Sequence, residues 1–120
     1  MNTHVPESRY LALPVLLSTD LRRSSAYYSD GLGFAVYKEE DGLRVRGAEI
    51  DLKLTPCRDG SLNSNLSVVF RVKDLKKLHL EFRQRSLPKL GKLKQGLFGL
   101  CQFSLTDPDG NSLYFVEIQS

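Results

Sequence analysis

The sequence predicts an α+β fold built from two βαβββ modules that form mixed sheets, and three observations support this prediction. The segment Asp20-Leu21-Arg22-Arg23 returns 54 positions later as Asp74-Leu75-Lys76-Lys77. An apolar run of strand length precedes each copy, and apolar residues at helical spacing follow it. Short runs of alternating apolar and polar residues complete each half, so one module is expected at about 9–55 and the other at about 66–118.

In the first module, a strand is predicted over residues 10–17. A helix follows, and it begins at Ser18-Thr19-Asp20, where side-chain oxygens can cap it. One face of this helix carries Leu21, Ser24, Tyr28 and Leu32. Gly31 or Gly33 is expected to end the helix. Three strands then follow at 34–38, 43–46 and 49–55, with hairpin turns at Asp41-Gly42 and Gly47.

The second module repeats this order with a strand at 66–72 and a helix at 74–85. Residues 86–99 are broken by Pro88 and several glycines, which predicts a loop with at most one short strand. Strands at 100–106 and 112–118 then form a hairpin around Asp107-Pro108-Asp109-Gly110, a sequence typical of a turn.

The composition is typical of one globular domain over residues 1–120, because 41% of the residues are hydrophobic and 26% are charged. The apolar run at 11–17 is interrupted by Pro14 and is far shorter than the roughly 20 residues of a membrane span, so no membrane partner is expected. The first residues lack the blocks of a secretory signal, which predicts a cytoplasmic location. The net charge of +3 is spread along the chain, which disfavours nucleic-acid binding.

Two smaller features have simple interpretations. Cys57 and Cys101 have no second cysteine or histidine at metal-ligand spacing, and both are expected to be reduced thiols. The most basic segment, residues 89–94, is either a solvated loop or the border of an anion site. The loop around it, residues 86–99, is expected to carry ligand specificity, since loops on a rigid scaffold often do so.

Side-chain alternation predicts that each sheet has an apolar face, covered by the helices, and a polar face. The polar face is either only solvated or the lining of a ligand cleft. It carries several Arg and Lys with few acidic residues, and Tyr114 lies on it with Val116 and Ile118. This mixture of aromatic, aliphatic and polar groups favours a cleft for a small molecule.

Two motifs carry a resemblance to a known superfamily. They are the segment from Asp20 to Phe34, which ends in Asp30-Gly31-Leu32-Gly33-Phe34, and the turn Asp107-Pro108-Asp109-Gly110 before the last strand. In this order they resemble the vicinal-oxygen-chelate superfamily, which includes glyoxalase I, extradiol dioxygenases and the bleomycin-resistance proteins. The resemblance spans residues 9–118 and implies two βαβββ modules, in agreement with the repeat.

Enzymes of that superfamily hold a divalent metal with His or Glu at four strand positions, two in each module. The shared motifs place these positions at Leu13, Lys53, Ser67 and Tyr114. Leucine has no donor atom, an ammonium repels a cation, and lone hydroxyls bind such metals weakly. No metal and no other cofactor is therefore expected, and metal-dependent glyoxalase or dioxygenase activity is disfavoured.

What remains resembles the bleomycin-resistance branch, whose members bind a drug unchanged, as homodimers with clefts at the subunit interface. This implies a metal-free homodimer that confers resistance to an antibiotic or toxin by sequestration. The pI near 8.9 predicts an anionic ligand in place of the cationic bleomycin. The expected ligand-binding residues are Arg46, Lys53, Ser67, Arg71, Phe98, Gln102 and Tyr114.

Two other functions stay open. A metal-independent lyase or isomerase of the same superfamily would use Tyr114 or Asp51 as acid or base beside Lys53, whose pKa neighbouring cations would lower. Alternatively, the polar face is a contact between protein subunits and binds no small molecule. No Ser-His-Asp or Cys-His arrangement follows from spacing, so binding without turnover is the preferred hypothesis.

Overall fold

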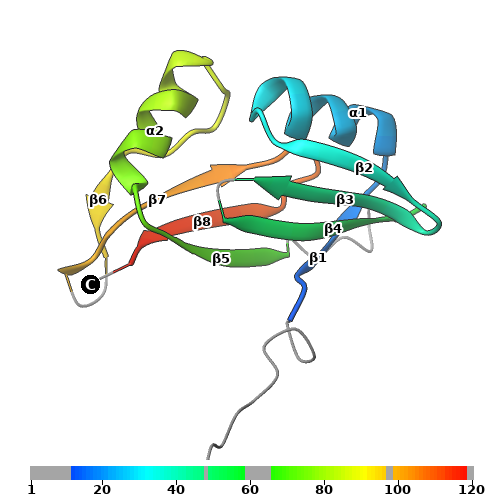
Figure 1. Cartoon of the computed structure of the whole chain (residues 1–120). Coiled ribbons are helices and arrows are strands. Elements are labelled where there is room, and N and C mark those ends of the chain that lie inside the picture. The colour runs from blue at the N-terminus through cyan, green and yellow to red at the C-terminus, as the bar shows by residue number, and fades with distance from the viewer. Residues whose placement is uncertain (1–11, 48, 59–65, 97–98, 119–120) are drawn as a thin grey trace, which may run out of the picture.

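The two modules form two four-stranded sheets with the same strand order, which confirms the predicted repeat. The computed structural model describes residues 12–47, 49–58, 66–96 and 99–118. Sheet A has the order β1-β4-β3-β2, and sheet B has the order β5-β8-β7-β6. The parallel neighbours are β1 with β4 in sheet A and β5 with β8 in sheet B, and the other neighbouring strands are antiparallel. Helices α1 and α2 lie on the same side of the sheets (Figure 1).

The elements follow the predicted order closely. Module one contains β1 (Val15–Ser18), α1 (Leu21–Ala26), η1 (Tyr27–Gly31), β2 (Ala35–Glu39), β3 (Gly42–Gly47) and β4 (Ile50–Pro56). Module two contains β5 (Ser67–Val72), α2 (Leu75–Gln84), β6 (Lys94–Gln95), β7 (Cys101–Thr106) and β8 (Ser112–Glu117). The predicted loop after α2 thus carries one short strand, as expected.

The first strand is shorter than predicted because Pro14 stands before it. Pairing with β4 begins at Pro14, whose carbonyl accepts a hydrogen bond of 2.8 Å from the Lys53 amide. Proline has no N–H with which to extend the ladder, and β1 begins at Val15. Residues 10 and 11 of the predicted strand lie outside the described residues.

The first helix begins and ends as predicted but changes its winding. The Asp20 side chain caps it by accepting a bond of 3.1 Å from the Arg23 amide. The chain then continues from α1 into the π-helical turn η1, where the Leu32 amide donates to the Tyr27 carbonyl at 2.9 Å. The predicted apolar face packs on the core.

No helix in the described ranges is long and apolar enough to cross a membrane.

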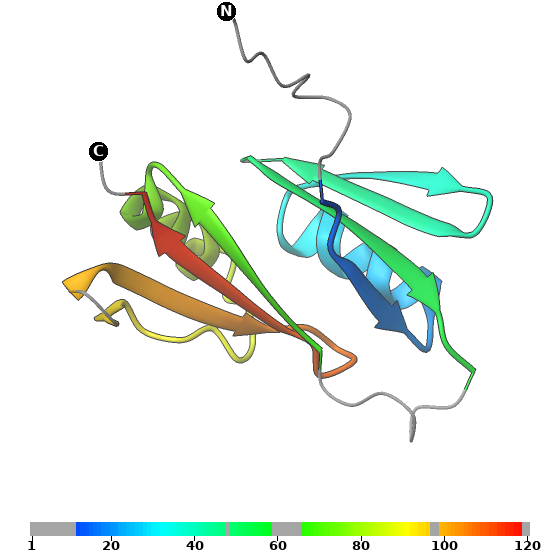
Figure 2. The ribbon, with the colours of Figure 1, turned by 90° about the horizontal axis from the view of Figure 1, so that it is seen from below.

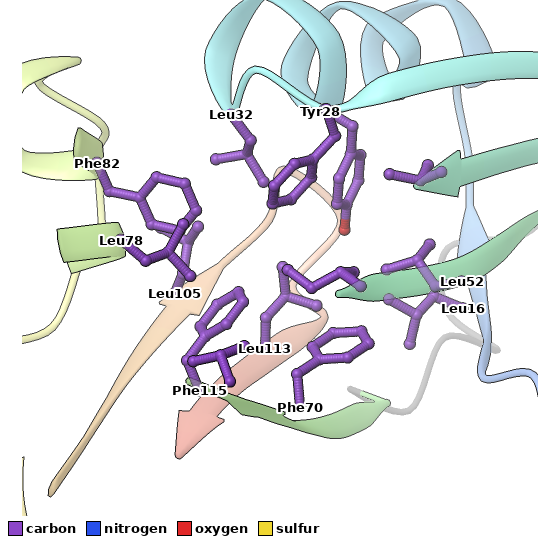
Figure 3. Close-up of a cluster of buried hydrophobic side chains, with 14 of the residues drawn as sticks. Leu16, Tyr28, Leu32, Leu52, Phe70, Leu78, Phe82, Leu105, Leu113 and Phe115 are labelled. Atoms are coloured by element: carbon purple, nitrogen blue, oxygen red, sulfur yellow. The ribbon is translucent and has the colours of Figure 1, made fainter. Parts of the chain in front are cut away.

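One hydrophobic core lies between the helices and the apolar faces of both sheets. Figure 3 shows Leu16 and Leu52 from sheet A and Phe115 from sheet B pointing into the same cluster. Phe115 stacks on Phe103 with ring centroids 4.9 Å apart and meets the edge of Phe82 from α2 at 5.7 Å. Each large apolar side chain stabilises the fold by roughly 1.5–3 kcal/mol when it is fully buried.

Polar contacts between the modules are concentrated at the turn of residues 107–110, which docks on the start of the first helix. The Asp109 carboxylate accepts hydrogen bonds from the Thr19 amide at 3.0 Å, the Thr19 hydroxyl at 2.6 Å and the Arg23 guanidinium at 2.9 Å. Burial alone would raise the pKa of Asp109, but the bonds from Thr19 and the charge of Arg23 outweigh it, so that this pKa is lowered.

Asp107 supports the same junction from inside the core. Its carboxylate accepts bonds from the Tyr28 hydroxyl at 2.8 Å and from the amide and side chain of Asn111, each at 2.9 Å. The Asn111 side chain also donates to the Leu17 carbonyl of β1 at 2.9 Å. Burial and the neighbouring Asp107 raise the pKa of Tyr28 well above its usual value, so this phenol stays a donor.

We expect Asp109→Ala to lower the free energy of unfolding by about 2–4 kcal/mol at pH 7, because donors of module one lose a buried charged acceptor. The folded-state pKa of Asp109 lies below the ordinary value of 3.8, so its stabilising effect is present above that pH. The difference between wild type and variant should disappear as the pH falls through the folded-state pKa.

Urea denaturation at pH 7 and at a series of pH values below 3.8 measures this difference. Asp30→Ala is the matched control, since the exposed Asp30 side chain makes no hydrogen bond or ion pair with the described residues, and it should change stability by less than about 0.5 kcal/mol. Equal stability of the Asp109 variant and wild type at pH 7 would contradict the role of this junction.

Candidate ligand-binding face

Each sheet turns one face away from its helix, and we call these surfaces the polar faces of sheets A and B. In Figure 2, seen from the side opposite the helices, the strands of both modules lie in front of the helices. Burial confirms the predicted alternation, because Val45, Leu52, Phe103 and Phe115 are fully buried on the helix side. Several large apolar side chains on the polar faces stay exposed: Val15, Tyr37, Val69, Tyr114 and Ile118.

The polar face of sheet B carries a row of side chains across all four strands. The register places Arg71 of β5 beside Val116, Val116 beside Gln102 of β7, and Gln102 beside Lys94 of β6. Cβ atoms of directly opposed residues lie about 4.5–5.5 Å apart. Neither Arg71 nor Lys94 has an ion-pair partner among the described residues, and both are exposed. The row therefore presents two uncompensated cations with an amide between them.

The next rows of the same face are apolar and then hydroxylic. Val69, Tyr114 and Ser104 form the second row, in which Val69 is 61% exposed and Tyr114 is 36% exposed. Ser67, Ser112 and Thr106 form the third row. A ligand that lies along this face would meet cations first, then an apolar surface with one aromatic ring, and then hydroxyl groups.

Sheet A has a similar row, but its charges are compensated. Here Tyr37, Arg44, Lys53 and Val15 lie side by side across the four strands. The Lys53 ammonium donates to Glu39 at 3.0 Å and also to Asp41. The expected excess of cations over acids is therefore not found on this sheet.

Asp51 compensates the two arginines of β3. Arg44 forms two bonds of 2.6 and 2.8 Å to the Asp51 carboxylate, and the Arg46 guanidinium lies 3.6 Å from the same group. Arg46 and Lys53 thus share a polar face with neighbouring acids. Arg71, Gln102 and Tyr114 lie together on sheet B, with Ser67 one row beyond Tyr114.

Glycine at position 42 brings the acids of the β2–β3 hairpin to Lys53. A Cβ atom at Gly42 would lie 2.0 Å from the Leu54 carbonyl oxygen, and the backbone there has a φ of 154°. Only glycine permits this close approach of β3 to β4. The turn therefore holds Glu39 and Asp41 against Lys53, although they lie 14 and 12 positions away in the sequence.

These ion pairs contradict the expected chemistry of Lys53. Its pKa is raised by the hydrogen bond to Asp41 and then by that to Glu39, whereas a general base at neutral pH needs a lowered pKa. The bond from Arg44 lowers the pKa of Asp51, which disfavours Asp51 as a proton donor. Lys53 therefore does not have the lowered pKa that a base needs, and Asp51 does not have the raised pKa that an acid needs.

The four positions that hold a metal in superfamily enzymes do not fit one here. Leu13 offers no donor atom, and the Lys53 ammonium is engaged by two carboxylates. Ser67 and Tyr114 offer hydroxyl oxygens alone. Among the described residues, no three His, Cys, Asp or Glu side chains lie together as a ligand set.

Four residues complete the comparison with the sequence. Phe98, an expected ligand contact, lies outside the described residues. Cys57 and Cys101 form no disulfide with each other. Lys94 joins the cationic row of sheet B but was expected only within a loop, because β6 has two residues and is too short to show an alternating pattern.

Two sheets of identical topology, each with a helix on one face and an open polar surface on the other, define a protein of paired βαβββ modules. The family model described as the Glyoxalase/Bleomycin resistance protein/Dioxygenase superfamily matches residues 10–115. The chain belongs to this superfamily, as its motifs indicated. No curated protein matches the sequence significantly.

Solved structures support the same assignment. The bleomycin-binding protein from bleomycin-producing Streptomyces verticillus, complexed with copper(II)-bleomycin, is 26% identical, with a TM-score of 0.80 over 92% of this chain and 98% of that one. A bleomycin resistance determinant encoded on the transposon Tn5 is 21% identical, with a TM-score of 0.80 over 92% and 99%. Lactoylglutathione lyase from Agrobacterium tumefaciens is 17% identical, with a TM-score of 0.70 over 93% and 96%. The last two likenesses show the fold alone.

The pairing of Lys53 leads to a measurable expectation. Acylation by an N-hydroxysuccinimide ester at pH 8, followed by peptide mass spectrometry, should modify Lys53 several-fold more slowly than Lys94, because its pKa is raised and its ammonium is held by carboxylates. Replacing both partners, as in Glu39→Gln with Asp41→Asn, should bring the two rates together. Faster acylation of Lys53 than of Lys94 in the wild type would restore a role for it as a base.

Proposed function

We propose that this protein is a metal-free, cytoplasmic homodimer that binds a small anionic molecule on its polar faces and releases it unchanged. The observation that carries the proposal is the row of Arg71, Gln102 and Lys94, in which two cations have no acidic partner among the described residues. Uncompensated cations beside an exposed aromatic ring favour a ligand with an anionic group and an apolar body. A relative by structure binds a small molecule, copper(II)-bleomycin.

The rows assign a role to each residue. Arg71 and Lys94 bind the anionic group, and Gln102 between them orients it through its amide. Tyr114 and Val69 contact the apolar body, and Ser67 accepts or donates a hydrogen bond at the far end. This order follows the direction of β7, along which the face changes from cationic to apolar to hydroxylic.

Sheet A has a secondary role in this proposal. Arg46 and Lys53 stay as contacts for the ligand, but each must share its charge with acids already bound to it. They therefore add less to anion binding than Arg71 does, and more to the shape and hydrogen bonding of the surface. Phe98 stays a predicted contact, because its position lies outside the described residues.

A second copy of the chain completes the site. The exposed apolar side chains of the polar faces, Val15, Tyr37, Val69 and Ile118, form an open surface within one chain. Pockets that bind small molecules enclose most of the ligand surface, and an open sheet does not. A symmetric dimer that covers these side chains would supply the missing walls and remove apolar surface from water.

Sequestration is the biological use that fits this chemistry. A protein that holds a toxic compound without altering it needs affinity and enclosure, and it needs no reacting group. The lowered pKa of Asp51 and the raised pKa of Lys53 agree with the absence of acid–base catalysis at that pair. The uncompensated cations favour an acidic antibiotic or toxin over the cationic bleomycin.

A ligand screen tests the proposal. Thermal-shift measurements with acidic antibiotics and aromatic carboxylic acids, each beside its neutral amide, should show stabilisation by the acids only. Native mass spectrometry of the same sample should show a dimer without metal, and chromatography after denaturation should return the ligand unchanged. Conversion of the ligand to a product would replace binding with catalysis as the function.

Charge reversal locates the site. For an acid found in that screen, Arg71→Glu should weaken binding 10-fold to 100-fold, which corresponds to about 1.4–2.8 kcal/mol, the size of a lost charge-assisted hydrogen bond. Lys76→Glu, on the exposed side of α2, is the matched control and should bind as wild type does. The affinity of the Lys53→Glu variant measures how much sheet A contributes to ligand binding. Unchanged affinity in both the Arg71 and Lys53 variants would exclude the polar faces as the ligand site.

A further inference from the structure

A hollow whose chemistry differs from that of the polar faces lies on the helix side of sheet B. Its volume is about 410 Å³, and it is lined by His79, Arg83, Leu90, Gly91, Lys92 and Leu93. Residues 79 and 83 come from α2, and residues 90–93 come from the segment before β6. The hollow contains none of the residues assigned to the polar faces, so its ligand would be independent of the one proposed above.

His79 fixes the wall of this hollow. Its Nε2 lies 2.9 Å from the Gly91 carbonyl, which can only accept, so this nitrogen carries the proton. The ring packs on Phe103 with centroids 4.7 Å apart, and the residue is 7% exposed. The Gly91 amide in turn donates to the Ser104 carbonyl at 2.8 Å. The segment is therefore tied to α2 on one side and to β7 on the other.

The backbone before this segment is held in an uncommon conformation. Ser86 and Lys89 have φ values of 53° and 60°, which place two non-glycine residues in the left-handed region within four positions. Such conformations cost free energy and persist where the surrounding structure enforces them, often at sites that bind ligands. Here the left-handed conformations of Ser86 and Lys89 turn the chain so that residues 90–93 lie beside α2. The hollow therefore exists before any ligand binds.

The lining combines positive charge with apolar surface. Arg83 and Lys92 have no ion-pair partner among the described residues, and no carboxylate lines the hollow. Leu90 and Leu93 are partly buried and pack against the core. A hollow between α1 and the β2–β3 hairpin is larger, at about 680 Å³, but it mixes four acidic residues with two basic ones and defines no single ligand charge.

We propose that the hollow beside α2 binds an organic anion with an apolar chain of medium length, such as a medium-chain carboxylate. Arg83 and Lys92 pair with the carboxylate, and the chain lies on Leu90 and Leu93. His79 is a positioning residue that holds Gly91 and thereby the wall. The basic segment at 89–94 is then the border of an anion site, as one interpretation of the sequence allowed.

Nuclear magnetic resonance tests the site with octanoate as the probe, below its micelle concentration. Octanoate should shift the imidazole signals of His79 and the amide of Gly91 in a saturable way, whereas octylamine and acetate should not. Arg83→Gln with Lys92→Gln should weaken octanoate binding at least tenfold. Lys76→Gln with Lys77→Gln, also on α2 but outside the hollow, is the matched control and should leave the affinity unchanged.

Four results would overturn the inference. Three of them are equal loss of octanoate binding in the two double variants, equal binding of octylamine, and shifts confined to residues of the polar faces. Arg71→Glu should leave octanoate binding intact, so failure of this site and failure of the proposed function give different results. Urea denaturation of each variant establishes that it is folded, and a folded variant without Arg83 and Lys92 that still binds octanoate as wild type does would end the proposal.

Discussion

The docking of the 107–110 turn on the first helix is the contact on which the arrangement of the two modules depends. An apolar core stabilises the modules together but permits many orientations, because burial of apolar surface has little directional preference. Hydrogen bonds to buried carboxylates do have direction. The Asp109 carboxylate accepts bonds from Thr19 and Arg23, and the Asp107 carboxylate accepts bonds from Tyr28 and Asn111. An unpaired buried carboxylate is costly, so other orientations are disfavoured.

The distribution of charge follows from which turns close which strands. In sheet A the β2–β3 hairpin folds its acids onto Lys53, and Asp51 stands beside the arginines of β3. In sheet B the corresponding strand β6 is short and brings a lysine in place of acids. The polar faces of the two modules thus differ in electrostatic potential. A ligand that spans both sheets would therefore bind favourably in only one orientation.

Much of this architecture could be predicted because it depends on patterns among residues that are close together in the sequence. The echo of Asp20-Leu21 at Asp74-Leu75 and the alternation along each strand are properties of neighbouring residues, and both appear in the structure. The partners of Lys53 are different, since they depend on the register of a hairpin and on the close approach at Gly42. Alternation places a side chain on a face and says nothing about which charges that face brings together.

The same limit applies to the cationic row of sheet B. Arg71 and Gln102 were placed on one face by alternation, but their alignment with Lys94 needs the pairing of β6 with β7. No periodic signal exists in a strand of two residues. For a comparable sequence, alternation assigns each charge to a face, but the charges that lie side by side are known only after strand pairing is known.

The strands at the sheet edges also bear on how chains of this kind associate. An edge strand exposes backbone N–H and C=O groups that can add a further strand, and natural proteins shorten, charge or interrupt such edges. Here β1 has four residues after Pro14, and β6 has two. The other two edge strands are longer: β2 has five residues and ends in the charged Lys38 and Glu39, whereas β5 has six residues and an exposed valine at its centre. When the protein is partly unfolded or concentrated, β5 is thus the edge strand most open to the addition of a strand from another molecule. The charged Arg71 side chain on β5 then also opposes aggregation.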